Sequence, residues 1–280
     1  MVKKILFFFF IVLSYQATGQ NDLEKAKQNV AKSKTNTSSS SYNDTYNKHR
    51  NQNEDYKEDS ASFFENVFFE VAYALTIGLV QVTFIDTPPE RESLHASTNI
   101  SEFPYVIDSI GGFNPYYESK KARWHITDRY LMNSDLQGNY FRTELQFAKR
   151  FSLMGDITKL VEQNPNVPNT EYTQYTMMAN YYRLRGRRWS IWYGIGARYI
   201  GEGIDKFGFA YNFGTRIYVT KPLSLETSFI GSDVNGSAVH HFNSHVKWHL
   251  NRFYISAGYD KHKISSSDFH MFGTGIGIYF

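Results

Sequence analysis

The segment VHHFNSHVKWHL, residues 239–250, carries residue types that can bind a metal ion or act in acid–base chemistry. If the segment is a β-strand, His241, His245 and His249 share one face. Successive side chains on one face of a strand lie about 7 Å apart, so all three could not bind one ion. We therefore predict hydrogen-bonded histidines, with Asp260 and His262 on the next segment as partners, and no metal ion or cofactor.

Charged residues on neighbouring segments repeat the same spacing. Arg142 and Glu144 lie two apart, and Arg198, Arg216 and Glu226 occupy polar positions between apolar ones. A buried charge needs a partner, so opposite signs on neighbouring strands favour an internal ion-pair network. The predicted network comprises Arg142, Glu144, Arg198, Arg216, Glu226, His241, His245 and Asp260.

The elements that must position these residues are strands with strict alternation. In residues 207–219, Phe209, Phe213 and Ile217 fall on one face, and Ala210 and Arg216 on the other. Most of the alternating segments are close to the ~9–11 residues with which a tilted strand crosses a bilayer. The predicted strands are 122–132, 140–149, 153–162, 171–184, 189–199, 207–219, 225–230, 238–250, 253–264 and 269–280.

Alternation alone would also suit a soluble β-sandwich. Aromatic residues make up 17% of the chain, and many lie near the strand ends, as in the interfacial girdles of membrane barrels. The last segment places Ile276, Ile278 and Phe280 on its apolar face, a pattern typical of the C-terminal insertion signal of bacterial outer-membrane barrels. We predict an all-β fold, a transmembrane antiparallel up-and-down β-barrel of about ten strands, with eight and twelve as alternatives.

Residues 1–19 combine two lysines, a short apolar run and a small-residue cleavage site, which predicts a secretory signal peptide. Residues 20–62 are polar and predict a disordered periplasmic linker or tether. We interpret 63–121 as a short apolar helix followed by an irregular segment, with two barrel strands as the alternative to the helix, and 122–280 as the barrel. The expected location is the outer membrane.

The chain resembles small outer-membrane β-barrel proteins of the Bacteroidota type. The resemblance is one of pattern and rests on Gln20 after the signal, the aromatic block 63–69, the Phe-Pro-Tyr triplet 103–105, and the strands from Phe141 to Phe280. It implies fold and location, and it implies no substrate, ligand or catalytic residue.

The predicted interior limits the function. Wide aqueous pores belong to barrels of ~16 strands or more, and charged residues with Trp192 and Tyr218 would fill much of a ten-stranded lumen. Glycines would leave one side of it roomy, enough for a plug, a narrow channel or a small apolar ligand; the alternative is that they allow strong strand coiling. We expect a structural or accessory role in an envelope assembly; a narrow channel for small solutes and a lipid-modifying enzyme are the alternatives. The glycines concerned are Gly194, Gly196, Gly208, Gly214, Gly258, Gly273, Gly275 and Gly277.

The expected partners follow from this location. They are outer-membrane lipid, the barrel-assembly machinery through the C-terminal strand, and other outer-membrane proteins. The net charge of only +3, with basic and acidic residues interspersed, argues against nucleic acid. If Phe280 is periplasmic, the short joins near 149–150, 185–188, 220–222 and 250–252 are periplasmic as well, and the remaining joins lie outside.

Overall fold

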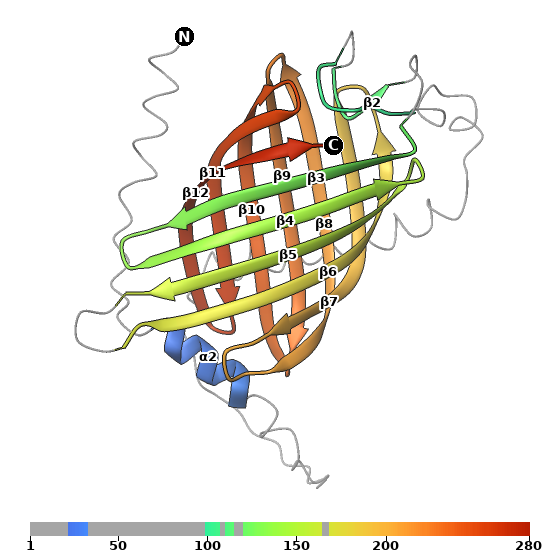
Figure 1. Ribbon diagram of the computed structural model, residues 1–280. Helices are drawn as coiled ribbons and strands as arrows, with labels where there is room; N and C mark the ends of the chain where they lie inside the picture. Colours follow the sequence, from blue (N-terminus) through green and yellow to red (C-terminus); the bar gives the residue numbers. More distant parts are fainter. Residues whose placement is uncertain (1–21, 33–98, 107–109, 115–119, 164–167) are drawn as a thin grey trace, which may run out of the picture. The chain divides into compact units, whose positions relative to one another are not determined.

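The computed structural model describes residues 22–32, 99–106, 110–114, 120–163 and 168–280. Within these residues, ten antiparallel strands form a closed barrel, accompanied by one helix and a small two-stranded sheet (Figure 1). The barrel strands are β3 (Ala122–Met132), β4 (Leu136–Phe147), β5 (Phe151–Glu162), β6 (Thr170–Arg185), β7 (Trp189–Ile200), β8 (Lys206–Thr220), β9 (Leu223–Val234), β10 (Ser237–Leu250), β11 (Phe253–Ile264) and β12 (Ser267–Tyr279).

Residues that alternate in the sequence lie on opposite faces of each strand. In β8, Ala210, Asn212 and Arg216 are buried, whereas Phe209 and Phe213 are exposed. Polar side chains line the inside of the barrel, which we call the lumen, and apolar side chains cover its outside. The predicted fold class is confirmed with ten strands, so the alternatives of eight and twelve are excluded.

Each strand pairs with its neighbours in sequence, and β12 returns to pair with β3. This closing ladder is short: β12 pairs with β3 only from Phe272 to Tyr279, whereas it pairs with β11 from Ser267 to Ile278. Backbone hydrogen bonds between Trp124 and Phe280 complete the ladder, with the amide of Phe280 2.8 Å from the carbonyl oxygen of Trp124.

Two strands extend furthest beyond their predicted bounds, β4 at its start and β9 at its end. β4 begins at Leu136 because the side-chain oxygen of Asn133 accepts hydrogen bonds from the amides of Asp135 (2.9 Å) and Leu136 (2.6 Å), which makes the turn tight. β9 spans Leu223–Val234 because its Gly-Ser-Asp sequence, which is typical of a turn, pairs with β8.

The helix α2 (Asp22–Lys32) lies within the 20–62 segment for which the sequence predicts a disordered linker, so that prediction is wrong for these eleven residues. Its apolar residues Leu23, Ala26 and Val30 recur at helical spacing and are completely buried. The predicted signal peptide and the predicted apolar helix that begins at residue 63 lie outside the described residues. No helix in the described part of the chain has the length and apolar composition needed to cross a membrane.

The two ends of the barrel carry different segments. At the α2 end, α2 packs on the barrel, with the side-chain amide of Asn235, in the β9–β10 turn, donating to the carbonyl oxygen of Val30 (2.6 Å). The other end, which we call the Phe280 end, carries the sheet formed by β1 (Asn99–Ile100) and β2 (Phe113–Asn114). This small sheet falls within the segment predicted to be irregular.

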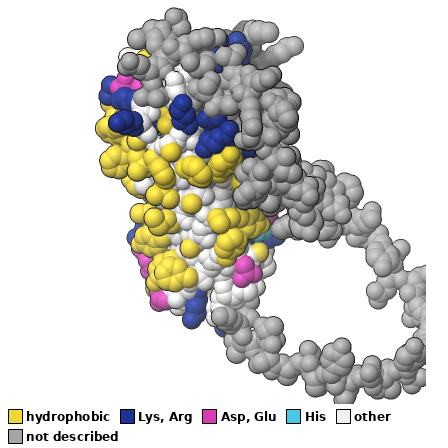
Figure 2. Space-filling model, turned by 90° about the vertical axis from the view of Figure 1, so that its right-hand side faces the viewer, with side chains coloured by type: hydrophobic (Ala, Val, Ile, Leu, Met, Phe, Trp, Pro, Cys, Tyr) yellow, Lys and Arg dark blue, Asp and Glu magenta, His cyan; other side chains and the backbone are white. Residues whose placement is uncertain are grey.

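The outer surface of the barrel is apolar through its middle. Ile195, Phe209 and Ile276 are each more than 60% exposed, and Figure 2 shows hydrophobic side chains across the visible wall, with Lys and Arg gathered towards one end. Ion pairs occupy the outer surface of some strands near the α2 end. Exposed aromatic side chains towards the Phe280 end are Trp124, Phe147, Phe151, Trp189, Trp248, Phe253 and Phe280.

Candidate functional site

The centre of the lumen holds one carboxylate surrounded by three cations. Glu226 Oε2 lies 2.6 Å from Nε of Arg216 and 2.8 Å from Nζ of Lys247. Its other oxygen lies 3.6 Å from Nη1 of Arg142, which reaches across from β4. Arg216 and Glu226 are direct cross-strand partners of β8 and β9, so the strand register itself creates this pair.

A second carboxylate holds Arg142 in place. Nε of Arg142 donates to Asp156 (2.7 Å), its cross-strand partner on β5, and the hydroxyl of Tyr140 donates to the same oxygen (2.8 Å). Both charged groups are almost completely buried. A buried pair is retained only with good geometry and further hydrogen bonds, and this one has both.

Glu144 links two walls of the barrel. It accepts hydrogen bonds from the hydroxyls of Ser152 (2.8 Å) and Tyr182 (2.7 Å). Nη2 of Arg216 lies 3.7 Å from its second oxygen, so Arg216 is shared between Glu144 and Glu226. The network is therefore continuous from β4 across the lumen to β8 and β9.

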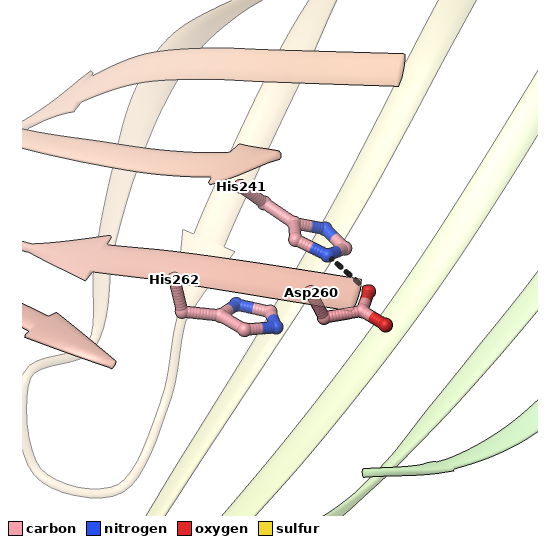
Figure 3. Close-up of side chains that lie close together, drawn as sticks. All are labelled: His241, Asp260 and His262. Atoms are coloured by element: carbon pink, nitrogen blue, oxygen red, sulfur yellow. Dashed lines mark hydrogen bonds and ion pairs between the residues drawn. The ribbon is translucent and has the colours of Figure 1, made fainter. Parts of the chain in front are cut away.

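Two histidines flank a third buried carboxylate. Nε2 of His241 lies 3.0 Å from one oxygen of Asp260, and Nε2 of His245 lies 2.6 Å from the other (Figure 3 shows His241). Nη1 of Arg129 approaches Asp260 at 3.5 Å. The ring of His262 stacks on that of His241, with ring centres 4.0 Å apart. The potential metal ligands among these groups are His241, Asp260 and His262, whose ligand atoms lie within 4.8 Å of one another.

Arg198 differs from the other predicted network residues. It is completely buried, and its described hydrogen bonds run to the hydroxyls of Thr176 (3.1 Å) and Ser232 (3.0 Å) and to the carbonyl oxygen of Val239 (2.7 Å). None of these acceptors is a carboxylate. The structure therefore holds Arg198 by neutral oxygens near the α2 end, apart from the central ion pairs.

An apolar layer covers the network at the α2 end. Leu23, Ala26 and Val30 pack in one cluster with barrel residues that include Tyr172 and Ile264. Polar contacts at the rim add to it. These are the Asp22 amide to Glu162 (3.2 Å), Lys27 Nζ to the Glu171 carbonyl oxygen (2.7 Å) and Asn29 to the Ser266 hydroxyl (3.2 Å).

The Phe280 end is covered by residues 99–106 and 110–114. Nη1 of Arg123 donates to the carbonyl oxygens of Ser101 (3.2 Å) and Gly112 (3.0 Å), and the Tyr105 hydroxyl donates to that of Leu223 (2.5 Å). Burial, and secondarily the neighbouring Tyr218, raise the pKa of Tyr105 to about 12, so its phenol keeps its proton at neutral pH. This end is therefore covered through these hydrogen bonds and through the packing of Ile100 and Phe113 against Tyr182 and Trp192.

A cavity among the described residues of the lumen is small. A cavity of about 10 Å³ lies against Arg129, Tyr140, Lys247 and Ser256, which is about the space that a single water molecule needs. The prediction that glycines leave one side of the lumen roomy is wrong. Each of the eight positions is closely approached by neighbouring atoms: a Cβ on Gly214, for example, would collide with the ring of Trp192.

A serine and a histidine meet at the Phe280 end. The hydroxyl of Ser224 lies 2.7 Å from Nε2 of His249, the distance expected of a nucleophile and its base. Both side chains point into the lumen and are buried, and the ring of Tyr105 lies 5.5 Å from that of His249. Nδ1 of His249 has no hydrogen-bond partner among the described residues, so nothing described there orients the imidazole as a base.

All eight residues of the predicted network lie in the lumen, and seven of them make ion pairs or His–carboxylate contacts with one another or with the further residues of the network. Arg129, which pairs with Asp260, is not among the predicted residues, although its alternation with Trp124 and Tyr130 carries the signal. Of the predicted insertion signal, Ile276 is 65% and Phe280 48% exposed on the outer face. Ile278 lies on that face between them.

Fold and lumen together define a ten-stranded up-and-down barrel with a polar, filled interior. No protein-family model matches the chain, and no curated protein matches it. Similar solved structures include the KdgM porin, with 12% identity over 56% of this chain and 99% of that chain and a TM-score of 0.37. The Yersinia pestis outer membrane protein Ail has 14% identity over 57% of this chain and 99% of its own chain, with a TM-score of 0.33. The outer membrane protein OprG from Pseudomonas aeruginosa has 9% identity over 57% of this chain and 96% of its own chain, with a TM-score of 0.31. Similarity at this level carries no information on what this chain binds or transports.

Proposed function

We propose that this protein is a closed outer-membrane β-barrel with a structural or accessory role in an envelope assembly. The location is supported by the exposed apolar wall, since large apolar side chains such as Ile195 and Ile276 are favourable against lipid and unfavourable in water. It is also supported by the aromatic side chains near the Phe280 end, where a membrane interface would lie.

The observation that carries the closed state is the filled lumen. Glu226 with its three cations occupies the centre, Leu23 lies in the apolar cover at one end, and Tyr105 lies in the hydrogen-bonded cover at the other. A permeating ion would have to separate buried ion pairs, each of which is strongly stabilised once its partners are desolvated. A barrel of this kind presents its outer wall and its ends to partners, and it offers solutes no path.

The closed state is tested by electrical recording. The protein without residues 1–19 is refolded into lipid vesicles and fused with a planar bilayer; we expect no stepwise conductance. A matched variant, Glu226→Ser with Arg216→Ser and Lys247→Ser, removes the central cluster without changing the outer wall. Conductance in this variant alone supports the proposal, and reproducible steps from the unaltered protein favour a narrow channel instead.

The accessory role needs a separate measurement. Membranes from cells that make the untagged protein at its native level are solubilised in mild detergent and separated by native electrophoresis. We expect migration as a complex of defined stoichiometry, well above the 32.5 kDa chain. Migration as a lone monomer contradicts the accessory role while leaving the closed barrel intact.

A further inference from the structure

Three side chains from two neighbouring strands bring nitrogen and oxygen ligands together in the lumen. His241 lies on β10, directly opposite His262 on β11, and Asp260 lies two residues before His262 on the same face. Figure 3 shows the three side chains on one side of these strands, with His241 directed at the carboxylate. We propose that His241, Asp260 and His262 form a binding site for a divalent transition-metal ion of the zinc class.

The donor set fits this class of ion. Two imidazoles and a carboxylate are the ligands of many zinc sites, and imidazole selects against magnesium and calcium, which prefer oxygen ligands alone. All three residues are at least 99% buried, and their ligand atoms lie within 4.8 Å of one another. Zinc–nitrogen bonds of about 2.0–2.1 Å place ligand atoms of a tetrahedral site roughly 3.4 Å apart. The most widely separated ligand atoms must therefore close in by roughly 1.4 Å.

The state of His262 points independently to a ligand. Its Nε2 is buried and has no hydrogen-bond partner among the described residues. Buried polar atoms rarely lack a partner, and such an atom calls for a water or an ion. The rings of His241 and His262 are stacked, with planes 13° apart.

The surroundings supply an outer shell and one opposing charge. Nε2 of His245 lies 2.6 Å from the Asp260 oxygen Oδ2, so it can orient the carboxylate while Oδ1 binds the ion. Arg129 lies 3.5 Å from Oδ1 and must withdraw as the ion binds. Its guanidinium also lies over the ring of Tyr140, 4.1 Å from the ring centre. Arg129 can retain this contact when it moves away from Asp260.

The position of the cluster suggests how an ion reaches it. Val239 and Ile264 lie two residues beyond His241 and His262 towards the α2 end, on the same faces of β10 and β11. Both belong to the apolar cluster that contains Leu23 and Val30 of α2. The site therefore lies one layer beneath α2, and an ion enters either during folding or when α2 is displaced.

The test uses Co²⁺ as a coloured probe on untagged protein lacking residues 1–19. After refolding with Co²⁺ and removal of excess ion, we expect one Co²⁺ per chain and visible absorption bands of a low-coordinate site. His262→Gln should lower the affinity at least about tenfold, the lower range seen when metal sites lose supporting groups. His249→Gln is the matched control, because His249 is a buried lumen histidine bonded to Ser224 outside the cluster.

Heat-modifiable migration on gels checks that each variant is folded. Should His262→Gln not fold, Asp260→Asn, which preserves the shape of the side chain, takes its place. The proposal is overturned if the unaltered folded protein binds no stoichiometric Co²⁺, or if the folded ligand variant binds it as tightly as the His249→Gln control.

Discussion

The outer wall and the lumen are built from alternate residues of the same strands, yet they are specified differently. On β8, Phe209 and Phe213 face outwards, and any apolar side chain would suit that surface. Arg216 faces inwards and needs Glu226 and Glu144 at defined distances. The outer wall tolerates exchange within a chemical class, whereas the lumen depends on particular partners.

The largest expected effect comes from removing the anion shared by three cations. Glu226→Gln leaves Arg216, Lys247 and Arg142 without their common partner, and breaking a buried pair in this way costs about 3–5 kcal/mol. Urea unfolding in lipid vesicles measures the loss in free energy of unfolding.

Asp233→Asn is the control for this change. Asp233 lies on the same strand and is exposed, and the oxygen that accepts a hydrogen bond from the Gly236 amide is retained in asparagine. We expect the stability of this variant to match the unaltered protein. Equal losses in both variants would contradict the distinction between lumen and wall.

A smaller effect is expected when a charge is placed on the wall. Phe213 lies at the middle of β8, and Phe213→Arg should cost about 2–4 kcal/mol in a bilayer, the cost of arginine facing lipid near the midplane. Phe213→Leu keeps the side chain apolar and should cost far less. The same unfolding measurement compares them, and a well-tolerated arginine would show that this face does not contact lipid.

The smallest effect is expected at the end of the last strand. The ring of Phe280 lies 6.1 Å from that of Trp124 on the outer surface, and its backbone closes the barrel. Phe280→Ser leaves this backbone pairing and should cost about 1 kcal/mol, close to half the value of complete burial of a Phe ring.

The amount in the outer membrane, measured by immunoblot of fractionated cells, is the readout for this variant. Phe253→Ser removes an equally exposed ring from another strand at the same end and serves as control. We expect a lower level for Phe280→Ser than for Phe253→Ser because we propose that the assembly machinery reads the C-terminal strand. Equal levels would refute that special role.

The sequence allowed the ten strands and their two faces to be predicted because a period of two is a local property. It did not allow the partners in the lumen to be predicted fully, because these depend on the register between strands. His241 and His262 come together only through the pairing of β10 with β11. The spacing predicts Asp260 and His262 as hydrogen-bond partners of the β10 histidines, and the register decides that His262 lies opposite His241.

The helix α2 was missed for a different reason. Only Leu23, Ala26 and Val30 are apolar and buried, and in a segment rich in Lys, Asn and Gln so few residues give a weak helical signal. Their burial comes from packing on the barrel, so the helix depends on a surface that local composition cannot reveal. β4 and β9 were predicted too short because turn-type residues at their ends are held in pairing by neighbouring strands.

The short closing ladder also bears on how the molecule assembles. Every other ladder joins strands that follow one another in the chain, whereas His125 pairs with Tyr279. Loop closure costs more entropy as the intervening chain lengthens, and non-local pairing slows folding. Closure of β12 onto β3 is thus expected to be the last and slowest event of folding. This ladder ends at Met132, whereas β12 continues towards Ser267 without a partner on β3. A partly unfolded barrel is therefore expected to open first between β3 and β12.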